Sequence, residues 1–121
     1  MNKIYWLICI SLFLVLQVYA DKPPATEVRA VWLTTNYGLD WPTNRTDVDV
    51  QKKELIKMLD DLKEFNFNTV FFQARTRGEV LYKSVIEPMS SVVAMAKPSQ
   101  ETFDPLQFAI EECHKRGIAC H

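Results

Sequence analysis

Hydrophobic and polar positions follow two different periods along residues 27–121. Short apolar runs at 28–33, 68–74 and 118–121 contain β-branched and aromatic side chains, which is typical of buried strands. Between these runs, apolar residues recur every three or four positions over 48–65 and 104–116, as on one face of an amphipathic helix. The pattern therefore predicts the order strand, helix, strand, helix, strand.

Residues that cap helices stand at both ends of each predicted helix. Thr46, Asp47 and Asp49 offer possible N-cap oxygens at the start of the first helix, and Asn66 is a plausible stop after it. The second helix begins with Asp104 followed by Pro105, and Gly117 ends it. The apolar stripes of the two helices are Leu55, Met58, Leu59 and Leu62 in the first and Leu106, Ala109, Ile110 and Cys113 in the second.

The alternation of strands and helices predicts an α/β fold with a parallel sheet and right-handed crossovers. Two architectures fit this order: a doubly wound sheet and the opening of a (β/α)8 barrel. Only a few residues join each helix to the next strand, whereas long loops at 35–46 and 76–103 follow the first two strands. Ligands of parallel α/β folds bind at the carboxyl ends of the strands. We therefore expect the functional site in these two loops.

The first 20 residues form a separate apolar segment. Lys3 gives a short basic start, Ile4 to Leu16 is apolar except for Ser11, and Val18 and Ala20 fit a cleavage site. We predict a signal peptide over 1–20, cleaved near Ala20, followed by a polar lead at 21–26; an uncleaved anchor is the alternative. The mature chain is then secreted to the periplasm, cell envelope or exterior, and the membrane contact is transient.

Charge and motif content exclude several classes of function. The chain has 14 Lys and Arg residues against 15 Asp and Glu, a net charge of -1, so no electrostatic attraction to nucleic acid is expected. The sequence contains no glycine-rich phosphate loop, no Ser-His-Asp set and no HExxH motif. We therefore expect no cofactor and no metal.

The loop after the first predicted strand combines aromatic, amide and charged side chains. Asn36, Tyr37, Asp40, Trp41 and Arg45 lie within it. Aromatic rings can lie against the C–H faces of a sugar while amide and charged groups bind its hydroxyls. The composition is compatible with a carbohydrate ligand. The interpretation that we favour from the sequence is that the two aromatic residues pack beneath the loop and that Pro42 stiffens it.

The second predicted strand ends in a polar and charged segment. Its two-residue period places Gln73 and Arg75 on one face, beside Arg77 and Glu79 in the following turn. A carboxylate paired with arginine stays ionised and suits ligand binding better than proton donation. Glu79 has three interpretations at this stage: a structural ion pair, a substrate contact and a catalytic carboxylate.

Two cysteines and two histidines stand near the end of the sequence. Cys113 with His114, and Cys120 with His121, do not have the ligand spacing of common zinc sites. Buried structural thiols, a disulfide and a metal site are the three alternatives, of which we favour the first.

Several segments in order resemble one protein family. They are 27–34 (EVRAVWLT), 39–42 (LDWP), 68–75 (NTVFFQAR), 77–79 (RGE), 86–88 (IEP) and 104–106 (DPL). Together they are similar to the N-terminal part of bacterial glycosyl hydrolase-like 10 proteins. The resemblance implies a secreted or envelope-attached TIM-barrel glycosidase acting on cell-wall glycan, such as peptidoglycan, or another polysaccharide. The site positions that it implies are Arg29, Trp32, Asp40, Trp41, Gln73, Arg75, Gly78, Glu79 and His121.

The resemblance implies that residues 27–121 are a truncated, N-terminal part of a barrel. A complete barrel has eight strands and about 250 residues, and glycoside hydrolysis usually needs two carboxylates, which such barrels usually carry on later strands. We expect the parent to be a glycoside hydrolase and this fragment to be inactive alone, with no catalytic residue assigned. The candidate substrate-binding residues are Asn36, Asp40, Trp41, Gln73, Arg75, Arg77, Glu79 and His121. A non-catalytic carbohydrate-binding module of the cell envelope is the alternative, and an unrelated doubly wound domain is a third possibility.

Overall fold

The computed structural model describes residues 27–94 and 103–121. The predicted signal peptide at 1–20 and the polar lead at 21–26 lie outside these residues. Among the helices of the two described segments, none has the length and apolar character needed to cross a membrane.

The three predicted strands form one parallel sheet. They are β1 (Ala30–Leu33), β2 (Thr69–Phe72) and β5 (Ala119–Cys120), and they lie in the order β1-β2-β5. Ala30 pairs with Thr69 and Val70 pairs with Cys120, which fixes the register across the sheet. The strands are shorter than their apolar runs, but their order and direction confirm the predicted α/β fold.

Two helices follow the strands and begin and end at the predicted caps. The Asp47 side chain accepts hydrogen bonds from two backbone N–H groups in the first turn of α2 (Val48–Glu64). The Asp104 side chain does the same for the N–H of Gln107 in α4 (Pro105–Lys115). These carboxylates satisfy donors that have no partner inside the helix and carry negative charge at its positive end.

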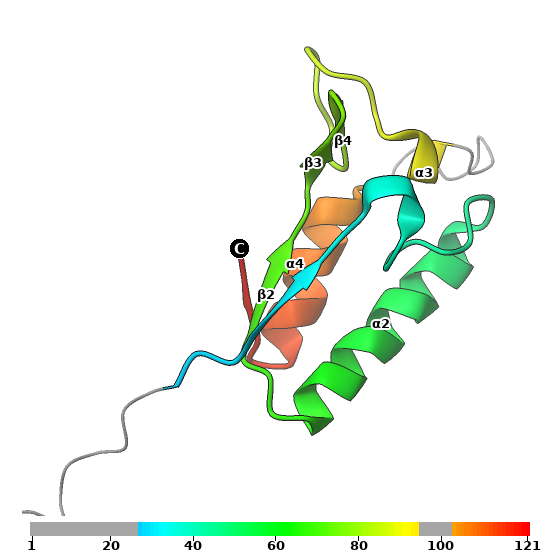
Figure 1. The fold of residues 1–121 in the computed structure, drawn as a ribbon. Helices are drawn as coiled ribbons and strands as arrows, with labels where there is room; N and C mark the ends of the chain where they lie inside the picture. The colour runs from blue at the N-terminus through cyan, green and yellow to red at the C-terminus, as the bar shows by residue number, and fades with distance from the viewer. Residues whose placement is uncertain (1–26, 95–102) are drawn as a thin grey trace, which may run out of the picture.

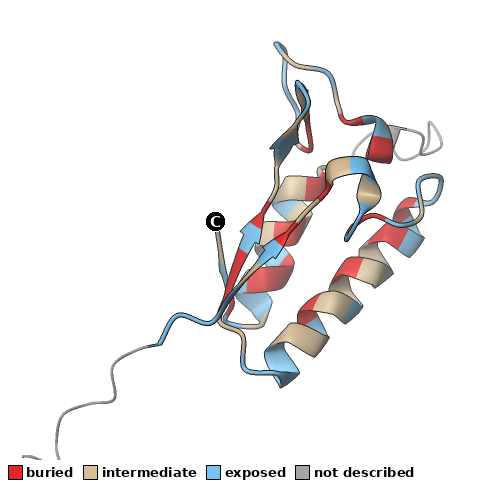
Figure 2. Cartoon of the chain, in the orientation of Figure 1, coloured by how far each residue is buried: buried red, intermediate tan, exposed pale blue. Residues whose placement is uncertain are grey.

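Both helices cover the same face of the sheet (Figure 1). Leu33, Val70 and Phe72 point toward them and are buried, whereas Trp32 and Phe71 point to the other face and are exposed (Figure 2). One continuous core results, formed by Leu33, Trp41, Leu55, Leu59, Val70, Phe72, Leu81, Val92, Val93, Ala109, Cys113 and Ile118. The sequential strand order and the two helices on one face are compatible with the beginning of a (β/α)8 barrel. One half of a doubly wound sheet has the same arrangement.

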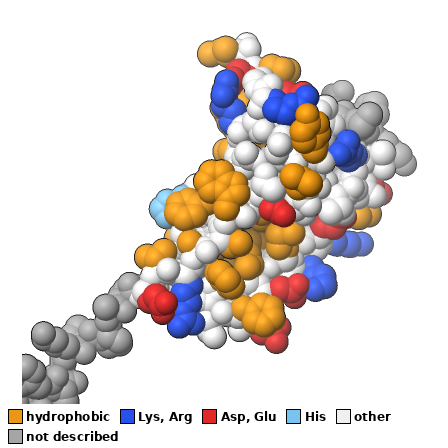
Figure 3. Space-filling view, in the orientation of Figure 1, with side chains coloured by type: hydrophobic (Ala, Val, Ile, Leu, Met, Phe, Trp, Pro, Cys, Tyr) orange, Lys and Arg blue, Asp and Glu red, His pale blue; other side chains and the backbone are white. Residues whose placement is uncertain are grey.

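The opposite face of the sheet has no helix over it in the described part of the chain. Trp32 is 62% exposed and stacks on Phe71, which is 40% exposed, with 6.2 Å between ring centroids. The His121 ring lies 5.8 Å from that of Phe71 and continues the row onto the third strand. Figure 3 shows hydrophobic side chains gathered on this side of the molecule. The Phe71 side of β2 is therefore uncovered within the described residues, because both crossovers place their helices on one side.

This uncovered aromatic row predicts self-association of the isolated chain. Exposed apolar patches and open strand edges are surfaces for pairing with other copies. Replacing Trp32 and Phe71 together with lysine should raise the monomer fraction measured by sedimentation velocity. The matched control replaces Val85 and Ile86, which are equally apolar and even more exposed in the loop after β4. If both pairs of substitutions raised the monomer fraction equally, this would contradict a role for the sheet face in self-association.

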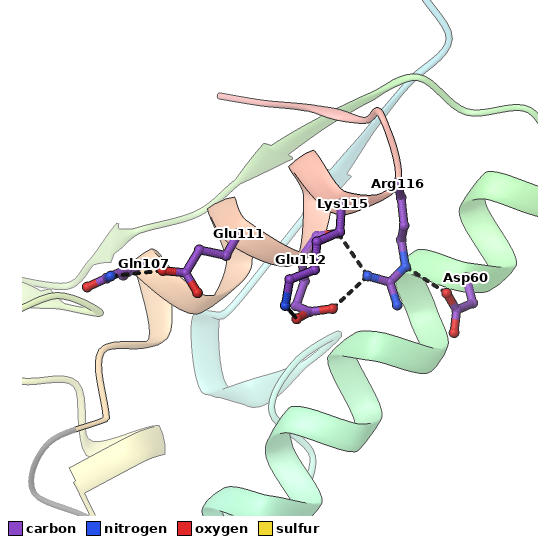
Figure 4. Close-up of polar contacts among 6 residues, drawn as sticks. All are labelled: Asp60, Gln107, Glu111, Glu112, Lys115 and Arg116. Carbon is purple, nitrogen blue, oxygen red and sulfur yellow. Dashed lines mark hydrogen bonds and ion pairs between the residues drawn. The ribbon is translucent and has the colours of Figure 1, made fainter.

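An ion-pair cluster joins α4 to α2 (Figure 4). The Arg116 guanidinium lies between two carboxylates, at 2.7 Å from Glu112 in its own helix and 2.6 Å from Asp60 in α2. Glu112 was not expected in the interior, yet its side chain is almost fully buried. Its two carboxylate oxygens accept hydrogen bonds from Lys115 and Arg116, which offset the cost of removing the charge from water.

We predict that this cluster makes stability depend on acid pH. Hydrogen bonds from Lys115 and Arg116 hold the pKa of Glu112 below its ordinary value of 4.5. A carboxyl group whose pKa is lowered in the folded state stabilises the fold at pH values above its ordinary pKa. This stabilisation is lost as the pH falls through the folded-state pKa. Urea unfolding at neutral pH should show that Glu112→Gln costs about 2 kcal/mol, and the difference should shrink below pH 4.5.

The matched control for Glu112 is its neighbour Glu111, which is exposed and contacts Gln107. Glu111→Gln should change the free energy of unfolding by no more than about 0.5 kcal/mol at any pH. Equal effects of the two substitutions would contradict the assigned role of the buried carboxylate.

Candidate functional site

The long loops at the carboxyl ends of the strands contain short elements of their own. The loop after β1 includes the 3-10 turn η1 (Asn36–Gly38). The segment after β2 forms a hairpin of β3 (Arg75–Thr76) and β4 (Glu79–Val80), followed by the short helix α3 (Ser91–Ala94). All of these lie at the same end of the molecule (Figure 1), as predicted from the loop lengths.

Gln73 holds the first loop against the end of β2. Its side-chain oxygen Oε1 accepts hydrogen bonds from Thr34 Oγ1 at 2.7 Å, from the backbone N–H of Thr35 at 2.9 Å and from that of Asn36 at 3.0 Å. The Thr35 hydroxyl in turn donates to the Gln73 carbonyl at 2.7 Å. Within the described residues, no hydrogen bond from the Gln73 Nε2 group to an acceptor is found.

Trp41 lies in the hydrophobic core and not on the surface of the loop. It is 0% exposed, packs against Phe72 with 5.8 Å between ring centroids, and donates its indole N–H to the carbonyl of Gln51 at 2.8 Å. A ring enclosed in this way presents no face to a sugar. The structure thus favours the interpretation in which this aromatic residue packs beneath the loop, and Trp41 is left out of the candidate binding surface.

Tyr37 and Arg77 connect the first loop to the hairpin. The Arg77 guanidinium lies 4.4 Å from the centroid of the Tyr37 ring, and the ring remains 58% exposed. Arg45 donates to the Tyr37 carbonyl at 2.6 Å, and Thr76 donates to the side-chain oxygen of Asn36 at 3.3 Å. Stacking of a guanidinium on an aromatic ring is favourable when partly desolvated. The result is a surface that offers an aromatic ring, a cation and an amide together.

Glu79 does not form the ion pair expected with its neighbouring arginines. Its carboxylate oxygen Oε2 accepts from the backbone N–H of Ser91 and the hydroxyl of Ser90, both at 3.0 Å, and from the Ser91 hydroxyl at 3.3 Å. These bonds lower the pKa of Glu79, with a smaller contribution from the charge of Arg77. Glu79 therefore fixes the start of α3 to the hairpin. The interpretation of Glu79 as part of an ion pair is therefore wrong. Its carboxylate instead accepts hydrogen bonds from serines that follow it by eleven and twelve residues.

Arg75 forms an ion pair with Glu87 and not with Glu79. Glu87 is not among the candidate residues predicted from the sequence. The Arg75 Nη2 atom lies 2.6 Å from Glu87 Oε1. The hydrogen bond and charge of Glu87 raise the pKa of Arg75, and those of Arg75 lower the pKa of Glu87. Only the presence of an acidic residue in the IEP segment could have indicated this contact from the sequence.

Asp40 and His121 lie at the margins of the site. Asp40 is exposed, accepts from the backbone N–H of Thr34 at 2.8 Å, and borders a largely apolar groove of about 410 Å³ between β1 and α2. His121 lies on the uncovered sheet face beside Phe71, and its backbone pairs with β2. The structure therefore brings Asn36, Gln73 and Arg77 together, and places His121 apart from them on the sheet.

The loop after β1 and the hairpin segment after β2 together form a rim at the carboxyl ends of the strands. The side chains of this rim form a polar surface suited to a ligand. Its carboxylates, Asp40, Glu79 and Glu87, are all engaged by hydrogen bonds. In residues 27–94 and 103–121, no group of three His, Cys, Asp or Glu side chains is arranged to hold a metal. An aromatic face with neighbouring amide and guanidinium donors matches the amphipathic surface of a sugar.

Comparison with known proteins identifies the family. Residues 27–121 match the family described as Glycosyl hydrolase-like 10. The chain is 39% identical over 115 residues to a protein named Glycosyl hydrolase DigH from Escherichia coli K12, an alignment that covers 84% of this chain and 26% of that protein. It is 36% identical over 103 residues to Glycosyl hydrolase YngK from Bacillus subtilis 168, covering 84% of this chain and 20% of that protein. The chain thus spans about a quarter or less of the length of these relatives. These matches confirm the resemblance found in the ordered segments: the chain belongs to the Glycosyl hydrolase-like 10 family.

Proposed function

We propose that this chain forms the opening βα units of a secreted (β/α)8 barrel that hydrolyses glycosidic bonds, and that its strand-end loops bind the glycan. Family membership supports the reaction class, and the parallel sheet with both helices on one face is compatible with the barrel. In a closed barrel the uncovered face with Trp32, Phe71 and His121 would become the interior. The substrate that we propose is cell-wall glycan or another polysaccharide.

The observation that carries the binding role is the Gln73 junction. Three donors from the first loop meet its Oε1 atom, and this brings Asn36 and Tyr37 beside the hairpin that contains Arg77. A site held by such bonds is largely formed before the ligand arrives, which lowers the entropy lost on binding. We assign glycan contacts to the open Tyr37 ring, to Gln73 Nε2 and to the Arg77 guanidinium.

The carboxylates of this rim are suited to binding a ligand or holding the loops in place, and not to general acid catalysis. A general acid needs a pKa near the working pH, whereas hydrogen bonds lower the pKa values of both Glu79 and Glu87. Asp40 accepts a backbone hydrogen bond and has no described carboxylate partner across the groove. We therefore assign the acid and base or nucleophile of the proposed reaction to other parts of a complete barrel.

The expected result for this chain alone is binding without cleavage. Incubation with cell-wall glycan strands and with other polysaccharides should release no reducing ends above the blank. Release of reducing ends would overturn this prediction and return Asp40, Glu79 and Glu87 to consideration as catalytic groups.

Binding is tested separately by titrating the same glycans in a calorimeter. Tyr37→Ala and Arg77→Ala should each weaken binding about fivefold, the value of one stacking or charged contact. Phe65→Ala is the matched control, because Phe65 is 70% exposed but follows α2 at the opposite end of the strands. Equal loss in the control, or unchanged affinity in both rim variants, would contradict the proposed site.

The alternative function is a carbohydrate-binding module of the cell envelope that does not cleave its ligand. The engagement of every described rim carboxylate favours it. Glycan binding by a longer family protein that contains this segment, with no hydrolysis by that protein, would support the module over the enzyme.

A further inference from the structure

Two thiols lie together on the helix-covered side of the sheet. Cys113 is in the last turns of α4 and is 1% exposed, while Cys120 is half-buried on β5. Cys120 pairs in register with Val70, a core residue, so its side chain points to the same face as that of Val70. Both cysteines belong to or pack against the same core cluster.

A tight turn joins the two elements that contain the cysteines, so both residues lie at the same core cluster. Gly117 adopts a φ of +65°, and the N–H of Ile118 then donates to the carbonyl of Cys113 at 2.9 Å. This folds β5 directly back along the end of α4. Interaction with the Cys120 thiol and burial raise the pKa of Cys113, and interaction with the Cys113 thiol lowers the pKa of Cys120.

We propose that Cys113 and Cys120 form an intramolecular disulfide that ties the end of α4 to β5 when the protein meets a disulfide oxidant. Both cysteines are free thiols in this structure, so the proposal concerns a modification of the described state. It is independent of the proposed glycan site, because the pair lies on the helix-covered face and the site lies at the strand ends.

The two cysteines have different roles in the reaction. The Cys120 thiolate, which is the more accessible, attacks a low-molecular-weight disulfide such as oxidised glutathione, forms a mixed disulfide and releases one glutathione thiolate. The Cys113 sulfur then attacks the Cys120 sulfur of the mixed disulfide, the sulfur–sulfur bond to glutathione breaks, and the Cys113 proton passes to the departing glutathione thiolate. In sum, two protein thiols and one glutathione disulfide give one protein disulfide and two glutathione thiols.

The test uses the 121-residue chain treated with oxidised glutathione, alkylated and digested with trypsin. Cleavage after Lys115 and Arg116 separates the cysteines, so a bond between them links the C-terminal peptide 117–121 to the peptide 84–115. Mass spectrometry without reduction should detect this linked pair. Cys9→Ser removes the third cysteine of the chain and should leave the linked pair unchanged.

Folding and geometry are tested by repeating the oxidation in concentrated urea. The proximity of the two thiols in the structure should make linkage at least about tenfold faster in buffer than in urea. Cys113→Ala should accumulate a glutathione adduct on Cys120, whereas Cys120→Ala should leave Cys113 largely unmodified because it is buried. Adducts without the linked pair, linkage to Cys9 or to another copy, or equal rates in buffer and urea would each overturn the proposal.

Discussion

Replacing Trp41 with alanine is expected to cost about 4 kcal/mol of unfolding free energy, the typical cost of removing a fully buried aromatic side chain. The indole fills the space between the first loop, Phe72 and α2, and its N–H satisfies the carbonyl of Gln51. A small domain has a total stability of only about 5–15 kcal/mol. Urea unfolding followed by circular dichroism at low protein concentration should therefore show a large fall in the midpoint concentration of urea.

The chain contains its own control for this substitution. Trp32 is the same residue type but is 62% exposed, and it contacts Phe71 on the uncovered face. Trp32→Ala should cost about 1 kcal/mol or less, the value of an exposed aromatic pair. Trp41→Phe should fall between the two, because it keeps most of the packing and loses the hydrogen bond. Similar effects of Trp32→Ala and Trp41→Ala would contradict the core position of Trp41.

Sequence periodicity predicts the regular elements because their signals are local. The stripe containing Leu55 and Leu59 is visible within a few turns, and Asp47 and Asp104 act on N–H groups two or three residues away. The strand order then follows from short connections and right-handed crossovers. These features depend on neighbouring residues, so one sequence is sufficient to predict them.

The details of the site depend on contacts between distant residues, and the sequence does not reveal these. The hairpin strands β3 and β4 have two residues each, too few to show a period. Glu79 binds serines that follow it by eleven and twelve residues, and Arg75 binds Glu87, twelve residues away. Residue types alone suggested an Arg–Glu79 pair. Backbone geometry decides which carboxylate each donor reaches.

Trp41 and Gln73 show the same limit in different ways. Composition correctly marks the first loop as rich in aromatic residues but does not separate Tyr37, which is exposed, from Trp41, which is buried. Alternation along β2 indicates where Gln73 lies but not that its oxygen is already occupied by the neighbouring loop. Tertiary packing decides which polar and aromatic groups remain available to a ligand.

Replacing Gln73 with leucine is expected to release the first loop. Leucine is similar in size but leaves the Thr34 hydroxyl and the N–H of Thr35 without their acceptor, and leaves the N–H of Asn36 with only its longer bond to Thr34 Oγ1 at 3.3 Å. Lost bonds to partly buried donors should cost about 2–3 kcal/mol in total. Amide hydrogen exchange at Thr35 and Asn36 should therefore accelerate about 10- to 100-fold, while the Val70 amide in the core should change less.

Gln73→Glu separates loop anchoring from ligand binding. The carboxylate keeps an acceptor at the Oε1 position and loses the Nε2 donor. Exchange at Thr35 and Asn36 should stay near that of the unmodified chain, whereas glycan affinity should fall if Nε2 contacts the ligand. The leucine variant should lose both properties, because Tyr37 is positioned by the same loop. Unchanged exchange in Gln73→Leu would show that other contacts hold the loop, and loss of exchange protection in Gln73→Glu would show that the accepting oxygen is not what anchors it.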